Sequence, residues 1–369
     1  MSIVTLSSSP QREEAQAILT VDLGALAENW KLLSARVAPA ECGAVVKADA
    51  YGTGIEAAVP ALTKAGCKTF FVAHASEGVR VRKVAPHATI YVLNGLLPDS
   101  VETLIAYDLR PVLGSMENVS AWQNVPGMRA CALHVDTGMN RLGLAPSDVA
   151  HAMSKDIAVD LLMTHFVSSE EASDATNDIQ IALFGAIRNA APHARTSLAN
   201  SSGLFLPQKP YGDLVRPGYA LYGGNPTPEQ NNPMRAVVSL EAPILQIRTI
   251  EGGDKVGYNA QWTAKRRTKL ATIGIGYADG LPRAAMSTDI RPGGEAMVAG
   301  VRCPFAGRVS MDLTVIDVSD VPEAALKDAR AQLLCEEITV DDLGLRAATI
   351  GYEILTRLGS RYHRQYVGG

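Results

Sequence analysis

The sequence of 369 residues lacks several features that define other kinds of protein. It has no stretch of about 18 apolar residues, the length that spans a membrane, and residues 1–20 lack the apolar run of a signal peptide. Its net charge of -4 gives no excess of basic residues for nucleic acid. We therefore expect a cytoplasmic protein whose partners include neither a membrane nor a nucleic acid.

Cysteine is scarce and is poorly spaced for metal binding. The five cysteines form no C-x-x-C pair, which would be typical of a zinc site or a redox motif. Their odd number and wide scatter predict reduced, mostly buried thiols, and we expect no metal site. The residues concerned are Cys42, Cys67, Cys131, Cys303 and Cys335.

What the chain does contain, from Ile18 to about Gly223, is an alternation of short apolar runs and amphipathic segments. Apolar residues recur at helical spacing in 24–37 and again in 55–66, and roughly eight strand and helix units fit this part. The strand-like runs are continuously apolar, which is typical of parallel strands buried on both faces. A (β/α)8 TIM-like barrel fits best. A doubly wound open sheet competes, but neither G-x-G-x-x-G after the first strand nor G-x-x-x-x-G-K-[ST] is present.

A second domain follows a linker-like stretch, GGNPTPEQNNP, at residues 223–233. Beyond it the pattern changes to alternating, β-rich segments with a closing helix near ATIGYEILTRL. We expect a barrel domain over residues 1–232 and a mostly β domain over 233–369. The first residues of the chain are also candidates for pairing with the β domain.

Polar residues stand at the ends of many predicted barrel strands. Barrel enzymes build their active sites at the carboxyl ends of the strands, so these residues are the candidates for chemistry. They are Lys47, His74, Asn94, Asp136, His165, Asn200, Ser201 and Arg216.

The stretch AVVKADAYGTG, residues 44–54, raises Lys47 above an ordinary surface lysine. Three small apolar residues before it indicate a buried approach, and desolvation lowers the pKa of an ammonium towards that of a nucleophilic amine. The hydroxyl of Tyr51 could bind a phosphate, while Gly52 and Gly54 allow close approach of the backbone. A solvated lysine at a strand end remains the plain alternative.

Late in the barrel, LANSSG and RPG supply small residues with accessible N–H groups, among them Ser201, Gly203 and Gly218. Late barrel loops are frequent phosphate sites because amides and helix N-termini favour an anion. A plain helix cap by Ser201 explains the first segment equally well. A reactive lysine and a phosphate cradle in one barrel indicate pyridoxal 5'-phosphate (PLP) as cofactor.

The successive motifs of this chain resemble those of alanine racemase, a PLP enzyme with a barrel and a C-terminal β domain. The resemblance runs from about Ile18 to Tyr352. It is carried by AVVKADAYGTG, HVDTGMNRLG, LANSSG, VRPGYALYG, VGYNAQWTA, GIGYADGLPR and GRVSMDLTVIDV.

The resemblance implies catalytic roles for two residues. Lys47 would hold PLP as a Schiff base and act as one base, and Tyr258 would act as the second base from the partner subunit of a homodimer with shared sites. Racemisation removes a proton from one face of Cα and returns one to the other, which suits two bases. Because tyrosine has a reference pKa of about 10, a nearby charged group would have to lower it.

The resemblance also implies residues that bind cofactor and substrate. Arg141 matches the arginine near the substrate carboxylate, Met311 the residue whose backbone meets that carboxylate, and His165 the histidine near the catalytic tyrosine. Arg216 would face the pyridine nitrogen and, since a guanidinium keeps its proton, weaken the ring as an electron sink. A surface ion pair is its plain alternative. The phosphate contacts carry over to Tyr51, Ser201, Gly218, Tyr219 and Tyr352.

One departure from the family concerns His134. The family commonly has a carbamylated lysine there, whose negative charge braces the arginine that Arg141 matches. Histidine forms no stable carbamate, so we hypothesise that a bound anion such as chloride lies beside His134. Activity that is indifferent to the anion present would count against this.

The resemblance predicts interconversion of L- and D-alanine, supplying D-alanine for peptidoglycan. Three alternatives stay open: a broader racemase acting on serine, lysine or arginine, a PLP decarboxylase of the same architecture, and a non-catalytic PLP-binding barrel. The last would lack the β domain, in which VGYNA lies.

Overall fold

The computed structural model describes residues 10–369 and divides into two compact units. The barrel unit comprises residues 26–235. The β unit joins the described residues before position 26 to residues 236–369. The first nine positions of the predicted barrel domain lie outside the described residues.

The barrel unit is built on seven parallel strands in sequential order, β3 to β9. Their apolar runs are buried on both faces; all four residues of β4 are buried, for example. This explains why the sequence shows continuous runs rather than alternation. The strands are β3 (Ala44–Val45), β4 (Thr69–Val72), β5 (Thr89–Val92), β6 (Arg110–Leu113), β7 (Ala130–His134), β8 (Ala158–Met163) and β9 (Arg195–Ser197).

A short eighth strand, β10 (Leu214–Val215), closes the barrel. On one side it pairs in parallel with β2 (Glu41–Cys42), and Val45 N donates to Pro217 O at 2.9 Å. On the other side Arg216 N donates to Ala199 O at 2.9 Å. Since β2 and β3 are successive parts of one interrupted strand, eight strand positions complete the ring, and the predicted (β/α)8 barrel is confirmed.

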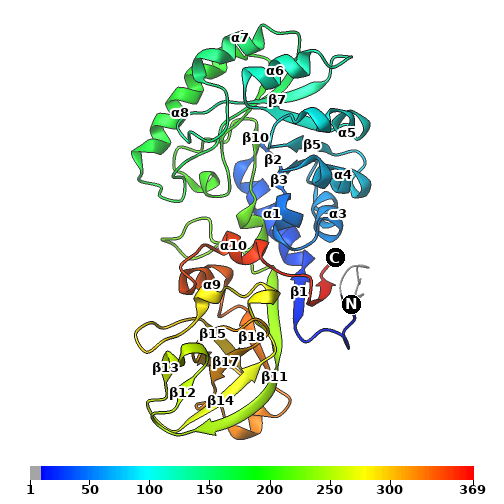
Figure 1. Ribbon diagram of the computed structural model, residues 1–369. Helices are drawn as coiled ribbons and strands as arrows, with labels where there is room; N and C mark the ends of the chain where they lie inside the picture. Colours follow the sequence, from blue (N-terminus) through cyan, green and yellow to red (C-terminus); the bar gives the residue numbers. More distant parts are fainter. Residues whose placement is uncertain (1–9) are drawn as a thin grey trace. The chain divides into compact units, whose positions relative to one another are not determined.

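Helices surround the strands of this unit (Figure 1). In α3 the residues Ile55, Val59 and Leu62 are fully buried, which is the apolar face that the spacing predicts. After β9 and β10 the chain forms only the short 3₁₀ helices η4 (Ser202–Phe205) and η5 (Tyr219–Tyr222). The α-helices are α1 (Leu23–Val37), α3 (Ile55–Ala65), α4 (Ala75–Val84), α5 (Val101–Ala106), α6 (Met116–Gln123), α7 (Val149–Met153) and α8 (Ala175–Ile187), with α2 (Lys47–Tyr51) treated below.

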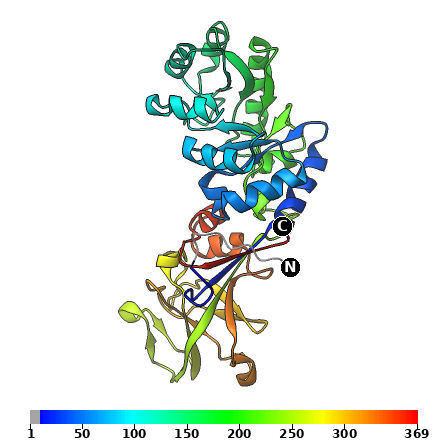
Figure 2. The same ribbon diagram turned by 90° about the vertical axis from the view of Figure 1, so that its right-hand side faces the viewer.

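The β unit is organised around the long strand β11 (Val238–Ile250), which pairs with β1, β14 and β18. Figure 2 shows β11 alongside β1 (Ile18–Asp22), and β1 also pairs in parallel with β19 (His363–Val367). The alternation that begins at Ile18 therefore starts with a strand of the β unit and not with a barrel strand. The other elements are β12 (Lys255–Val256), β13 (Trp262–Thr263), β14 (Thr268–Ile273), β15 (Glu295–Val298), β16 (Val301–Pro304), β17 (Thr314–Asp317), β18 (Arg330–Leu334), α9 (Val340–Arg346) and α10 (Gly351–Thr356).

Four of the five cysteines are buried and all five are unpaired, as the sequence predicts. Within residues 10–369, no helix is both long and apolar enough to cross a bilayer. The same residues contain no group of three or more His, Cys, Asp or Glu side chains placed to hold a metal ion.

Candidate active site

The carboxyl ends of the barrel strands carry the polar residues that the sequence singles out. Because these strands are parallel, their carboxyl ends meet at one rim of the barrel. The residues at this rim are Lys47 after β3, His74 after β4, Asn94 after β5, His134 and Asp136 at the end of β7, His165 after β8, Asn200 and Ser201 after β9, and Arg216 and Gly218 after β10. Tyr258, Met311 and Tyr352 lie in the β unit.

The segment after Lys47 is a left-handed turn. Ala48, Asp49, Ala50 and Tyr51 have φ of 52°, 56°, 53° and 53°. Each such conformation costs a non-glycine residue roughly 1–2 kcal/mol, so four in succession mark a segment that the surroundings must hold in place. The ring of Tyr51 stacks on that of Tyr222 at 4.6 Å between centroids.

The hydroxyl of Tyr51 ends beside Gly218. A Cβ at Gly218 would lie 2.4 Å from Tyr51 Oη, so only glycine leaves room for this approach. Burial raises the pKa of Tyr51, which keeps the hydroxyl protonated and able to donate.

Ser201 lies on the other side of this position. Its Oγ accepts hydrogen bonds from Gly218 N at 3.0 Å and from Ala220 N at 3.2 Å. Ser201 is 3% exposed, and Tyr219, next to Gly218, is also buried. A tyrosine hydroxyl and a serine hydroxyl, the second oriented by two backbone N–H groups, thus lie on either side of Gly218 in a buried space. Such a set suits an anion with several oxygen atoms.

Arg216 is buried in the barrel, with only 4% of its surface exposed. Its guanidinium donates to Ser197 Oγ at 2.5 Å and to Thr164 O at 2.6 Å. Burial lowers the pKa of Arg216 to about 9, which is still well above neutral pH, so the group stays charged. The geometry therefore does not support a surface ion pair for this arginine.

His165 is neutral at pH 7 because burial first, and the charges of Arg216 and Arg141 next, lower its pKa to about 3. Its Nδ1 lies 3.4 Å from Arg216 Nη2. A guanidinium can only donate, so we assign the imidazole proton to Nε2. The pKa of His134 falls to about 4, again mainly through burial, followed by the charge of Arg216.

Gln180 of α8 connects the loops after β7 and β8 through hydrogen bonds. Its Nε2 donates to Thr137 Oγ1 at 2.8 Å and to His165 O at 2.9 Å, and its Oε1 accepts from Val167 N at 2.9 Å. Thr137 Oγ1 also bonds Thr164 Oγ1 at 2.7 Å. Gln180 is fully buried, so this network fixes the backbone that carries His165 and accepts from Arg216.

Lys47 is partly buried, and burial is the main cause that lowers its pKa. The positive charges of Arg141 and Arg216 lower the pKa of Lys47 further, while Glu77 raises it. Arg141 itself is exposed in the loop after β7 and forms no hydrogen bond or ion pair within residues 10–369. The barrel unit thus supplies no carboxylate to brace Arg141.

In the β unit, the VGYNA and GRVSM motifs lie together. A Cβ at Gly257 would be 3.3 Å from Arg308 N, and Arg308 Nε donates to Gln261 Oε1 at 3.0 Å. Tyr258, in the 3₁₀ turn η6 (Tyr258–Ala260), is 67% exposed.

Met311 is 53% exposed, and its backbone is supported by the GYADG segment. Met311 O accepts from Ala278 N at 2.9 Å, and Ser310 O accepts from Tyr277 N at 3.0 Å. Tyr352 is half-buried in α10.

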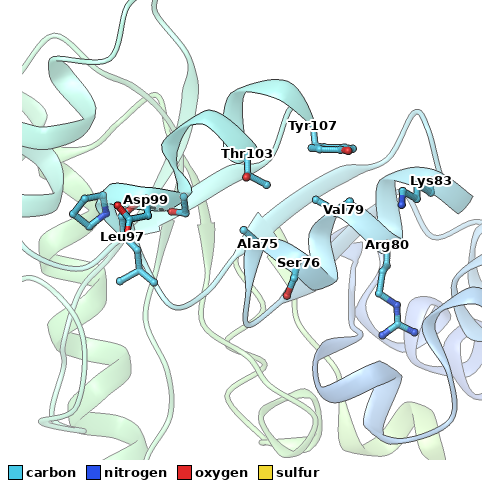
Figure 3. A pocket seen from close by; sticks show the side chains of 11 residues that line it. Ala75, Ser76, Val79, Arg80, Lys83, Leu97, Asp99, Thr103 and Tyr107 are labelled. Atoms are coloured by element: carbon cyan, nitrogen blue, oxygen red, sulfur yellow. Dashed lines mark hydrogen bonds between the residues drawn. The ribbon is translucent and has the colours of Figure 1, made fainter.

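A separate groove of about 760 Å³ lies on the outer side of the barrel unit, between α4 and α5 (Figure 3). None of the predicted site residues lines it, so we assign it no part in the site. Its walls include Ala75, Ser76, Val79, Arg80, Lys83, Leu97, Asp99, Thr103 and Tyr107.

Sequence reasoning misses several residues that shape the rim, notably Gln180, Ser197 and Glu77. A buried glutamine in a helix gives no motif of its own. Glu77 leaves a weak signal, because an acidic residue three positions after a helix N-cap is typical of a capping box.

The fold and the rim together define a class: two-domain barrel enzymes with a partly buried lysine and an anion cradle. The chain belongs to the alanine racemase family. The family model described as "Alanine racemase, N-terminal domain" matches residues 21–226, and the model described as "Alanine racemase, C-terminal domain" matches residues 237–366.

Individual relatives agree. The alanine racemase of Methylobacterium nodulans is 52% identical over 362 residues, covering 96% of this chain and 96% of that protein. The alanine racemase of Acidiphilium cryptum is 49% identical over 354 residues, covering 94% of this chain and 97% of that protein. The crystal structure of alanine racemase from Bartonella henselae with covalently bound pyridoxal phosphate has a TM-score of 0.90 and 36% identity, covering 96% of this chain and 100% of that one.

Gly218→Ala should weaken PLP binding at least tenfold because the added methyl displaces the buried Tyr51 hydroxyl. Gly218 has φ of -128° and ψ of -81°, which lies outside the main regions for alanine, so the backbone adds to the expected loss. A fluorescence titration of the cofactor-free protein measures the effect. Gly185→Ala, where a Cβ meets nothing within 4 Å, is the matched control. Equal affinity in the two variants would contradict the assignment.

His165→Asn should flatten the acid side of the stability curve. Folding keeps His165 neutral, so between its ordinary pKa of 6.5 and its folded pKa of about 3 the unfolded chain binds more protons and stability falls as pH falls. In the variant, the slope of the free energy of unfolding against pH should be smaller by up to about 1.4 kcal/mol per pH unit over this range. Urea unfolding at several pH values measures it. A parent-like slope in His165→Asn would be evidence against a neutral His165.

Proposed function

We propose that this chain is a PLP-dependent alanine racemase that interconverts L- and D-alanine with Lys47 and Tyr258 as its two bases. The observation that carries the proposal is the convergence, at one barrel rim, of Lys47, Arg216 and the Ser201–Gly218 cradle. The names of its relatives and the pyridoxal phosphate of the Bartonella structure support the same function.

The donor set of the rim fits PLP. A phosphate needs donors, and the cradle offers the hydroxyls of Tyr51 and Ser201, the second of which is oriented by the Gly218 and Ala220 amides that donate to its oxygen. An aldehyde needs a neutral amine, and burial lowers the pKa of Lys47. When bound, PLP supplies an electron sink for the bonds at the substrate's Cα.

Arg216 would influence which reactions the site favours. It remains charged, and a guanidinium offers donors and no acceptor. Any ring nitrogen that it meets can therefore receive a hydrogen bond but no proton from it. We infer that this favours simple proton removal and return over reactions that need a long-lived carbanion.

The two bases would act on opposite faces of Cα. Lys47 Nζ, with its lowered pKa, is suited to take or give one proton, and Tyr258 Oη would handle the other. The exposure of Tyr258 in the β unit is what a residue contributed to a partner's site requires. We propose a homodimer in which each site uses Lys47 of one subunit and Tyr258 of the other.

Arg141, the backbone of Met311 and Tyr352 complete the proposed site, with Arg141 and Met311 on the substrate carboxylate and Tyr352 on the phosphate. A broader racemase and a decarboxylase share the architecture. We prefer alanine as substrate because matches to the racemase models extend through both domains, which also makes a single-barrel PLP-binding protein unsuitable.

Lys47→Ala should abolish the visible absorbance of protein-bound cofactor and all racemisation. Tyr258→Phe should keep that absorbance but slow exchange of the α-hydrogen from one alanine enantiomer at least tenfold more than from the other. Deuterium exchange measured by NMR from each enantiomer, alongside assays with serine, lysine and arginine, tests both roles. Equal losses in the two directions would refute the two-base assignment.

Mixing the Lys47→Ala and Tyr258→Phe variants tests the shared site. In a dimer of one Lys47→Ala chain and one Tyr258→Phe chain, one site carries both changes and the other carries neither. After random exchange of subunits, about a quarter of the parent activity should return, because about half the dimers are mixed and each has one intact site of two. If mixing restores no activity although exchange occurs, the sites are not shared in this way.

Supply of D-alanine for peptidoglycan in the cytoplasm is the physiological part of the proposal. Expression of the chain should let a bacterial strain that requires added D-alanine grow without it, and Lys47→Ala should not. Growth that still depends on added D-alanine, with the protein present and active in extracts, would argue for a different role.

A further inference from the structure

The carboxylate of Glu77, in the first turn of α4, joins the loops that follow β3 and β4. Oε1 accepts from Ala48 N at 2.6 Å, and Oε2 accepts from Ala73 N at 2.9 Å and from His74 N at 3.1 Å. Three backbone donors from two strand ends thus converge on one side chain. Bonds to a charged acceptor are roughly twice as strong as neutral ones.

The bond to Ala48 acts directly on Lys47. The N–H of Ala48 belongs to the same rigid peptide plane as the Cα and carbonyl of Lys47. Fixing the direction of that N–H therefore fixes the backbone from which the Lys47 side chain leaves. It also holds the first residue of the left-handed turn, whose φ of 52° is unfavourable for alanine.

A second brace on the same helix holds the next residue of the turn. Arg80 Nη2 donates to Asp49 Oδ1 at 2.6 Å, and Arg80 Nε donates to Glu56 Oε1 at 2.7 Å. Asp49 Oδ1 also accepts from Ile55 N at 3.1 Å. Because Glu77 and Arg80 are three positions apart, they lie on one face of α4 and hold successive residues of the turn.

Glu77 also acts on Lys47 through its charge. Among the groups that affect the pKa of Lys47, Arg141 after β7 and Arg216 after β10 are positive, and Glu77 is negative. His165 after β8 is neutral at pH 7. Glu77 thus partly offsets two guanidinium groups.

We propose that Glu77 is a positioning residue for Lys47: its carboxylate holds the left-handed turn by the Ala48 amide and places the lysine amine at the barrel rim for the cofactor. This inference rests on the proposed function, because it assigns Glu77 a purpose only if Lys47 is the residue that holds PLP.

Reductive trapping tests the proposal without an activity assay. The cofactor-free protein is incubated with limiting PLP, reduced with borohydride at intervals and at several pH values, and the labelled Lys47 peptide is quantified by mass spectrometry. Glu77→Gln loses the charge and one acceptor atom, and Glu77→Asp keeps the charge with a shorter reach. Glu102→Gln is the control, since Glu102 is an exposed carboxylate in the first turn of the neighbouring helix α5.

Glu77→Gln should label Lys47 at least about tenfold more slowly than the parent, because small misplacement of a reacting group has large effects on rate. The midpoint of its pH profile should move to lower pH, since Lys47 loses a neighbouring negative charge. In Glu77→Asp, labelling of Lys47 should be slower than in the parent, and the midpoint of the pH profile should be the parent's. If Glu77→Gln does not fold, the labelling rate of Glu77→Asp alone tests the proposal. Glu102→Gln should match the parent.

Parent-like labelling of folded Glu77→Gln and Glu77→Asp would overturn the inference. Slower labelling of Glu77→Gln with an unchanged midpoint would also overturn it, because that is the result of a merely structural role. If the parent itself is not labelled at Lys47, the proposed function fails, and this outcome is distinct from the others.

Discussion

Closure of the barrel through β10 is the constraint on which the site depends. This strand has two residues, yet the backbone bonds of the two residues that follow it set three loops next to one another. Val45 N on Pro217 O places the end of β3, and so Lys47, beside the segment from Arg216 to Gly218. Arg216 N on Ala199 O places the loop of Ser201 on the opposite side. The lysine and the anion cradle are neighbours because the ring closes here.

The buried charge of Arg216 organises the electrostatics within that ring. A permanent cation at this depth has to be satisfied by acceptors, and Thr164 O and Ser197 Oγ provide them. Burial, followed by this charge, lowers the pKa of His134 and of His165, so both are neutral at pH 7. The rim therefore combines neutral imidazoles and a lysine of lowered pKa with two arginines, which is an environment that favours a ligand rich in negative charge.

The sequence predicts the barrel and its rim well because parallel strands buried on both faces leave continuous apolar runs that end in polar residues. Lys47, His165 and Arg216 are found in this way, and the structure places each at a carboxyl strand end. The sequence predicts the place of β1 less well. This strand pairs with β11 in the β unit, but its residues are as apolar as those of a barrel strand. The sequence does not predict the bonds of Glu77 to Ala48 N and Ala73 N or the network of Gln180, because their partners lie on other elements and are mostly main-chain atoms, which no side-chain pattern reveals.

The left-handed turn after Lys47 explains why the support around it is so extensive. Non-glycine residues in this conformation are each unfavourable by roughly 1–2 kcal/mol, so the turn would relax if its contacts were removed. Glycine at position 48 or 50 would relieve the strain, but it would also add freedom to the unfolded chain and to the turn itself. Alanine keeps the turn stiff, provided that Glu77, Arg80 and the stacking of Tyr51 on Tyr222 hold it. The strained turn and the contacts that hold it therefore act together. The turn residues prefer other backbone conformations, and the fixed contacts from outside the turn keep them, and Lys47 beside them, rigid.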